Sequence, residues 1–181
     1  MKRIVFFDVE TTGLDPGYDR IIELAAIEVY NNAITGRIFH SYYNPGIKVS
    51  KGAYLIHNIS DNFLSDKVKF KNNYYNFLSF INGTIAVAHN SSFDVRFINK
   101  ELRMINKDYD INNYCKILDS LNITRKISSS KNNTLDHLIA HYKLINHKRT
   151  SHSALLDSFY LANIILKISF YEKEFNLFIE E

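Results

Sequence analysis

The sequence predicts one α/β domain in which helices flank a mixed sheet of five strands. Residues 2–43 hold three stretches rich in β-branched residues, separated by short turns, which indicates an antiparallel meander. Beyond residue 66 helical and strand-like stretches alternate, as they do in α/β folds. The chain has 181 residues and is 46% hydrophobic, so it can bury the core of a single domain.

Five strands are expected, over residues 2–8, 20–30, 34–43, 84–88 and 114–118. Turn-forming residues at Asp15-Pro16-Gly17 and Asn31-Asn32 separate the first three. Helices are expected where apolar residues recur at helical spacing, over residues 70–80, 91–105, 135–142 and 153–168. Asn90 or Ser91 would cap the second of these, and residues 47–66 are expected to be irregular. We expect the domain to span residues 1–170, followed by a tail over 171–181.

Charge and cysteine content limit the class of protein. The net charge is +3, from 22 Lys and Arg against 19 Asp and Glu, which by itself does not imply nucleic acid. The single cysteine, Cys115, excludes an internal disulfide and a multi-thiolate zinc site. No signal peptide is recognised, and Lys167 interrupts the longest apolar run. We therefore expect a cytoplasmic protein without a membrane span.

Two acids stand where the first strand should stay apolar. Asp8 and Glu10 are two residues apart, so on a strand they share a face. Neighbouring carboxylates repel each other unless a proton or a cation lies between them, and hard cations such as Mg²⁺ or Mn²⁺ prefer oxygen ligands. Gly13 follows closely and allows a sharp turn. Taken alone, the pair could also be two solvated acids at a strand end.

Three further residues could join this pair. Asp94 falls in the first turn of a predicted helix, where the helix dipole alone could account for an acid. Asp157 lies among apolar residues of the last predicted helix, where a lone acid needs a partner. His152 is five residues earlier, about 140° around a helix axis, so it can serve the same site only from just before the helix. Taken alone, His152 could be a solvent-exposed histidine.

The three segments together resemble the DEDDh family of 3′–5′ exonucleases. Its motif D-x-E-T-T-G corresponds to Asp8–Gly13, H-N-x-x-F-D to His89–Asp94, and H-x-x-x-x-D to His152–Asp157. Flanking segments resemble the epsilon subunits of bacterial DNA polymerase III, among them Asp19–Glu23, His57–Asp61 and Asn133–Asp136. The similarity covers residues 2–168 and implies a ribonuclease H-like fold.

The resemblance also implies the chemistry of the site. Asp8, Glu10, Asp94 and Asp157 would hold two Mg²⁺ or Mn²⁺ ions, and His152 would take the proton from an attacking water. The substrate would be the 3′ end of single-stranded DNA, released as nucleoside 5′-monophosphates. The terminal nucleotide would lie against a set of seven residues: Thr11, Thr12, Gly13, Leu14, His57, Asn90 and Phe93. Asp119 corresponds to a position of the family that we expect to support the site structurally, without contacting the metal ions.

Two alternative functions are compatible with the same set of site residues. An RNA 3′–5′ exonuclease resembling ribonuclease T or oligoribonuclease would share the catalytic set, because only the 2′-hydroxyl distinguishes its substrate. A non-catalytic module could instead hold DNA ends or a polymerase, but such a module needs no general base.

The resemblance implies protein partners as well. One is the alpha subunit of DNA polymerase III, although epsilon subunits continue into a polymerase-binding segment and this sequence ends at Glu181. The segment Glu174–Phe178 resembles the peptide by which bacterial proteins bind the sliding clamp, with Glu174 in place of the usual Gln. The alternative is that Phe175 and Phe178 form one apolar face of a terminal helix.

Overall fold

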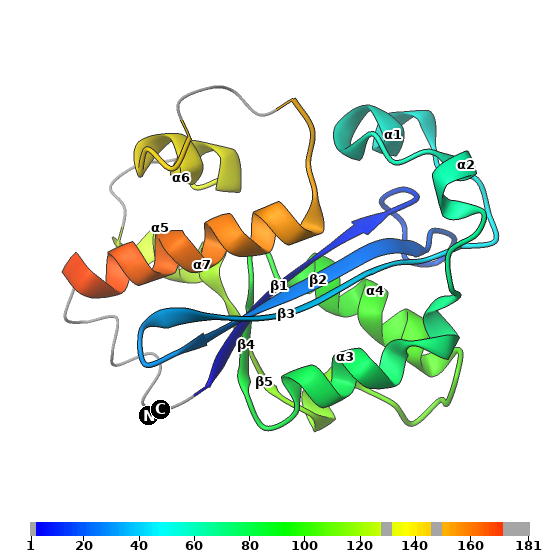
Figure 1. Ribbon diagram of the computed structural model, residues 1–181, viewed down its shortest axis with the longest axis horizontal. Helices are drawn as coiled ribbons and strands as arrows, with labels where there is room; N and C mark the ends of the chain where they lie inside the picture. Colours follow the sequence, from blue (N-terminus) through cyan, green and yellow to red (C-terminus); the bar gives the residue numbers. More distant parts are fainter. Residues whose placement is uncertain (1–2, 128–131, 146–149, 172–181) are drawn as a thin grey trace.

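The computed structural model describes residues 3–127, 132–145 and 150–171. A five-stranded sheet forms its centre, in the order β3-β2-β1-β4-β5 (Figure 1). The strands are β1 (Ile4–Thr11), β2 (Ile21–Tyr30), β3 (Ala33–Tyr42), β4 (Ile85–Ala88) and β5 (Lys116–Asp119). β1 pairs antiparallel with β2 and parallel with β4, so the predicted mixed sheet is confirmed.

The predicted meander is present, with its turn at Asn31 and Asn32. Both residues have positive φ, of 54° and 59°, as a tight hairpin between β2 and β3 requires. β1 starts and ends later than the predicted range 2–8, because its pairing with β2 continues to Thr11. Asp8 and Glu10 therefore lie within a central strand, and not beyond its end.

The two faces of the sheet carry separate cores. Val5, Phe7 and Val9 pack with α3 (Tyr74–Ile81) and α4 (Ser92–Arg103). Ile4 and Phe6 pack instead with α6 (Leu135–His141) and α7 (Ala154–Tyr171). Side chains alternate along a strand, so Asp8 and Glu10 continue the even-numbered row on the α7 side. This parity decides which helix can bring further groups to the two acids.

Several helix predictions need correction. Residues 47–66 are not irregular: α1 (Lys51–His57) and α2 (Asp61–Leu64) lie there, capped by Ser50 and Ser60. Three apolar side chains of α1 are exposed, so the segment lacks the amphipathic pattern that marks a helix in a sequence. The range 70–80 divides into a 3-10 turn, η1 (Phe70–Asn72), followed by α3.

The remaining differences are at helix ends and in one missed helix. Ser91 occupies the N-cap position of α4 without a side-chain capping bond, and Asn90 has a positive φ of 63°. A further 3-10 turn, η2 (Ile111–Asn113), and the helix α5 (Ser120–Ile127) were not expected. No described helix is long and apolar enough to cross a membrane. The segment Glu174–Phe178 lies outside the described residues, as does the tail beyond Tyr171.

Candidate active site

The site is centred on the carboxyl-terminal half of β1. Asp8 and Glu10 are each half-buried, and the fully buried Val9 separates them on the opposite face. β2 pairs with β1 as far as Thr11, whereas β4 pairs only with Ile4 to Phe6, so beside Asp8 and Glu10 the β4 edge of β1 carries no ladder bonds to a described strand. The predicted shared face of the two acids is confirmed by this alternation.

Asp94 reaches β1 from the α4 side of the sheet. It lies in the first turn of α4 and is only 2% exposed. Its Oδ1 accepts a hydrogen bond of 3.1 Å from the backbone N–H of Val9, which places the carboxyl between the positions of Asp8 and Glu10 along the strand. Burial, with a smaller contribution from the charge of Asp119, raises the pKa of Asp94 to about 8. A buried acid with this pKa is one that a nearby cation would stabilise in its ionised form.

Asp157 and His152 reach the site from the α7 side. Asp157 is 4% exposed in the first turn of α7, whereas His152 lies just before that helix, as its spacing from Asp157 required. Ligand atoms of Glu10, His152 and Asp157 all lie within 4.8 Å of one another. Asp8 and Asp94 are not part of that triad. The two carboxylates are oxygen donors of the kind that a hard divalent cation prefers, and the imidazole lies within reach of both.

His152 is held by contacts on both sides of its ring and by its backbone. Nδ1 lies 3.3 Å from Oδ2 of Asp157, and Nε2 lies 3.7 Å from Oδ2 of Asp136 on α6. Its backbone N–H donates to the carbonyl of Ile56 at the end of α1, across 2.9 Å. The imidazole is 36% exposed, so it is accessible to a substrate and to water.

The turn after β1 is held by a single carboxylate. Asp19 accepts hydrogen bonds from the Thr12 hydroxyl at 2.9 Å and from the Asp15 N–H at 2.9 Å. A Cβ on Gly13 would lie 2.4 Å from Oδ2 of Asp19, so this position requires glycine for close approach. Thr11 uses its hydroxyl on the Gly13 carbonyl, at 2.5 Å. The side chains of both threonines are therefore committed to the turn.

The other predicted nucleotide contacts have different environments. Leu14 is 78% exposed, Asn90 is exposed, and Phe93 packs on Phe97 with ring centroids 4.9 Å apart. His57 is 5% exposed, and its Nδ1 accepts from the Ile59 N–H at 3.0 Å, so the proton of the neutral ring is on Nε2.

Nε2 of His57 is a buried donor. It faces the Thr11 backbone carbonyl but forms no hydrogen bond of good geometry with any described residue. Burial lowers the pKa of His57, which keeps the ring neutral. A buried donor of this kind is available to an acceptor that arrives with a ligand.

Glu23 is the residue that sequence reasoning missed. It is fully buried on β2, opposite Glu10, and accepts from the Ser153 hydroxyl at 3.0 Å and from the Ala154 N–H at 3.1 Å. Nε2 of His40 lies 2.8 Å from Oε1 of Glu23, the oxygen that also accepts from Ser153. In the sequence, the feature that could have identified Glu23 is its position as the one acid in the otherwise apolar stretch Ile21–Ile27. Glu23 ties the start of α7 to the sheet, one residue beyond His152.

Asp119 has the supporting position that was expected. At the end of β5 its Oδ1 accepts from the N–H groups of Asn90 and Leu121, both at 2.9 Å. The carboxylate therefore holds the backbone that leads into α4 and Asp94.

Comparison with known proteins defines the class. The chain matches the family described as Exonuclease over residues 5–165. Exonuclease I of Escherichia coli bound to a dA16 oligonucleotide has a TM-score of 0.83 at 19% identity, covering 97% of this chain and 42% of that one. Exonuclease X bound to 5′-overhanging duplex DNA has a TM-score of 0.74 at 22% identity, covering 96% and 93%. These likenesses confirm the ribonuclease H-like fold.

Relatives at higher identity narrow the class further. The DNA polymerase III subunit epsilon of Buchnera aphidicola subsp. Schizaphis graminum is 44% identical over 171 residues, which are 91% of this chain and 73% of that protein. The subunit of the same name from Escherichia coli is 39% identical over 175 residues, or 93% and 72%. The chain belongs to the exonuclease family and, within it, to the epsilon subunits of DNA polymerase III. The predicted 3′–5′ exonuclease activity is thereby confirmed.

Proposed function

We propose that this chain removes nucleotides one at a time from the 3′ end of single-stranded DNA, as a proofreading exonuclease associated with the alpha subunit of DNA polymerase III. The observation that carries this proposal is the convergence of Glu10, Asp157 and His152 from distant parts of the chain, within 4.8 Å. The names of the epsilon relatives support the polymerase partner.

Asp8, Glu10, Asp94 and Asp157 would hold two Mg²⁺ or Mn²⁺ ions in this proposal. Two observations support this fit. All four ligands are carboxyl groups, which supply the oxygen atoms that these ions prefer. Burial raises the pKa of Asp94 to about 8, and a bound cation would stabilise the ionised form of this side chain. When bound, such ions supply the positive charge that a phosphodiester needs as negative charge builds up on it.

His152 would act as the general base. Its exposed imidazole accepts a proton from the attacking water, and Asp157 and Asp136 flank the ring, so a carboxylate stabilises the imidazolium that forms. The exposed Leu14 would contact the last base, and the buried Nε2–H of His57 would donate to the terminal nucleotide. Backbone groups of Thr11, Thr12 and Gly13 would line the same pocket, beside Asn90 and Phe93.

The direct test is hydrolysis of a labelled single strand. The purified chain with Mg²⁺ or Mn²⁺ should shorten a 5′-labelled DNA strand from its 3′ end and release nucleoside 5′-monophosphates. Asp8→Ala should abolish this activity. Folded protein that leaves the strand intact but binds its 3′ end would instead favour the non-catalytic module.

A matched RNA strand distinguishes the remaining alternative. DNA and RNA of the same sequence differ at the 2′-hydroxyl, so faster hydrolysis of RNA would favour an enzyme like ribonuclease T or oligoribonuclease. We expect DNA to be preferred, in line with the epsilon relatives. Copurification with the alpha subunit tests the partner, and binding by Glu174–Phe178 to the sliding clamp remains a separate prediction.

A further inference from the structure

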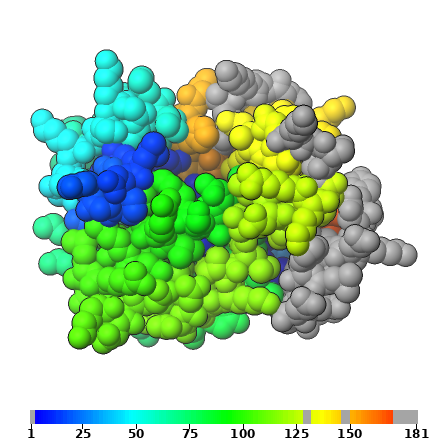
Figure 2. Space-filling view, turned by 180° about the vertical axis from the view of Figure 1, so that it is seen from behind, coloured from blue at the N-terminus to red at the C-terminus, as the bar shows by residue number. Residues whose placement is uncertain are grey.

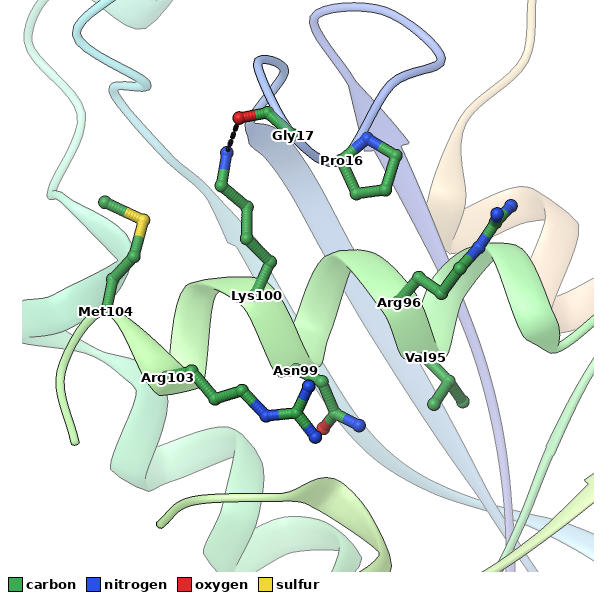
Figure 3. A pocket seen from close by; sticks show the side chains of 8 residues that line it. All are labelled: Pro16, Gly17, Val95, Arg96, Asn99, Lys100, Arg103 and Met104. Carbon is green, nitrogen blue, oxygen red and sulfur yellow. Dashed lines mark hydrogen bonds between the residues drawn. The ribbon is translucent and has the colours of Figure 1, made fainter. Parts of the chain in front are cut away.

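A pocket of about 540 Å³ lies between the loop that follows β1 and the outer face of α4 (Figure 3). Pro16 and Gly17 of the loop form one side, and the other is formed by Val95, Arg96, Asn99, Lys100, Arg103 and Met104. From behind the molecule, the blue surface of the first residues lies next to the green surface that includes α4 (Figure 2). We call this pocket the α4 groove.

Three cations follow one side of α4 along this groove. Arg96, Lys100 and Arg103 are four and three residues apart, the spacing of neighbours on a helix surface. Arg103 forms an ion pair of 2.5 Å with Asp110. In contrast, Arg96 and Lys100 form no salt bridge within the described part of the chain. Nε of Arg96 donates to the Ser92 carbonyl at 3.1 Å, and Nζ of Lys100 to the Asp19 carbonyl at 3.0 Å.

The acids of the loop leave these two charges without a carboxylate partner. Asp15 accepts from the Gly17 N–H at 2.7 Å, and Asp19 from Thr12 and Asp15. Glu101, the acid that follows Lys100, is 3% exposed and binds Arg20 on the inner side of the helix. Arg96 and Lys100 therefore present positive charge to the groove.

Both walls of the groove begin close, along the chain, to residues of the candidate active site. Its helical wall begins one residue after Asp94, and its loop wall begins three residues after Gly13. The bond from Arg96 to Ser92 turns the guanidinium toward the end of α4 that carries Asp94. From Arg96 to Arg103 the helix rises about 10 Å. That length matches about three steps of a stacked strand, at roughly 3.4 Å each.

The loop also offers surface for bases. Tyr18 is 82% exposed and adjoins Gly17, whose carbonyl lies 3.4 Å from Nζ of Lys100 (Figure 3). Leu14, which is 78% exposed, precedes them. A basic groove beside an exposed aromatic ring is the composition of sites that bind single-stranded nucleic acid, in which phosphates contact cations and bases stack on rings.

We propose that the α4 groove binds the phosphate backbone of the DNA strand on the 5′ side of the terminal nucleotide, through Arg96 and Lys100. This inference rests on the proposed 3′–5′ hydrolysis and adds the path of the strand as it leaves the site. It requires that affinity increase with strand length until the groove is filled, after about four nucleotides.

The test compares a long substrate with a small one. The small substrate is the 5′-p-nitrophenyl ester of thymidine monophosphate, which occupies the active site alone, and the long one is a DNA strand of about 12 nucleotides. Arg96→Glu, alone and with Lys100→Glu, should reduce kcat/KM on the strand roughly tenfold more than on the ester, mainly through KM. Lys116→Glu with Lys167→Glu makes the same change of charge on β5 and α7 and should not produce this difference.

Salt dependence supplies an independent readout. Each lost phosphate contact should reduce the slope of log KM against log salt concentration by about 0.7 for a single strand. Equal losses on both substrates, or an unchanged slope, would overturn the groove proposal. If the wild-type chain hydrolyses neither substrate, the proposed hydrolysis itself fails. If every variant still hydrolyses the ester, the catalytic step is intact, and the result on the long strand then tests the groove alone.

Discussion

Glu23 on β2 accepts a hydrogen bond from the backbone N–H of Ala154, the first residue of α7, across 3.1 Å. The same carboxylate accepts from the Ser153 hydroxyl at 3.0 Å. A fully buried carboxyl group requires such hydrogen-bond partners. Because His152 directly precedes these two residues, the carboxylate fixes the point from which the imidazole reaches Glu10 and Asp157.

Glu23→Gln should therefore slow catalysis by displacing His152. The amide oxygen can still accept from the Ala154 N–H, but the amide nitrogen accepts nothing, so the Ser153 hydroxyl must reverse and accept from it, which disturbs the residue that follows His152. We expect kcat to fall by up to about 100-fold, as misplacement of a reactive group can cause. In the background of His152→Gln the same change should have no further effect on kcat, because both act through one imidazole.

Glu28→Gln is the matched control for Glu23→Gln. Glu28 is also a buried acid of β2, but it pairs with Arg3 and Arg37, away from α7. The substitution Glu28→Gln should reduce the free energy of unfolding, while kcat stays close to the wild-type value. Fully additive losses for Glu23→Gln and His152→Gln would show that Glu23 does not act through His152.

His152→Gln should remove most of the rate while the fold is preserved. The side chain is 36% exposed, and the backbone bond from residue 152 to Ile56 does not depend on the imidazole. Loss of a general base costs about 100- to 10,000-fold in kcat. Steady-state kinetics measure the loss, and calorimetric titration with Mn²⁺ checks that metal still binds. His141→Gln, at an exposed position of α6, should keep full activity.

Asp94→Asn should abolish hydrolysis and yet stabilise the metal-free protein above neutral pH. The folded-state pKa of Asp94, about 8, exceeds the unfolded value near 3.8, so the folded protein binds this proton more tightly. Its favourable contribution is complete below pH of about 4 and is lost as pH rises toward 8. The amide has no proton to lose, and its oxygen can still accept from the Val9 N–H.

Urea denaturation in EDTA at several pH values measures this effect. The wild-type free energy of unfolding should fall between pH 5 and pH 8 by more than that of the variant. Addition of Mg²⁺ should restore stability to the wild type only. Asp108→Asn, at an exposed position after α4, should reproduce the wild-type curve. Parallel curves for wild type and Asp94→Asn would contradict the assigned pKa.

Gly13→Ala should destabilise the protein and weaken substrate binding. The added methyl would lie 2.4 Å from Oδ2 of Asp19, and relief requires the loss of bonds to Thr12 and Asp15. Overpacking of this kind costs about 1–3 kcal/mol. Gly52→Ala is the control, since its Cβ meets nothing within 4 Å and helical Gly→Ala changes stabilise by about 0.5–1 kcal/mol. Thermal denaturation should therefore move in opposite directions for the two variants.

Local patterns predicted much of the fold, but not the helices whose apolar residues face outward. β2 and α6 were predicted within a residue or so, because their periodicity and end signals are local. α1 was missed because Tyr54, Leu55 and Ile56 are exposed and no buried stripe marks it. Its caps at Ser50 and Asn58 define it in the structure, and its last turn receives the bond from His152.

By itself, the sequence determined that Asp8 and Glu10 share one face of a strand and that His152 must precede the helix of Asp157, because both follow from the repeat of a strand and of a helix. Only the tertiary structure decided that this face is the one covered by α7, that Glu23 anchors the start of α7, and that Arg96 and Lys100 border a groove formed with the loop after β1. These relationships join residues more than 75 positions apart in the chain (Glu23 and Ala154 differ by 131), and no local repeat encodes them.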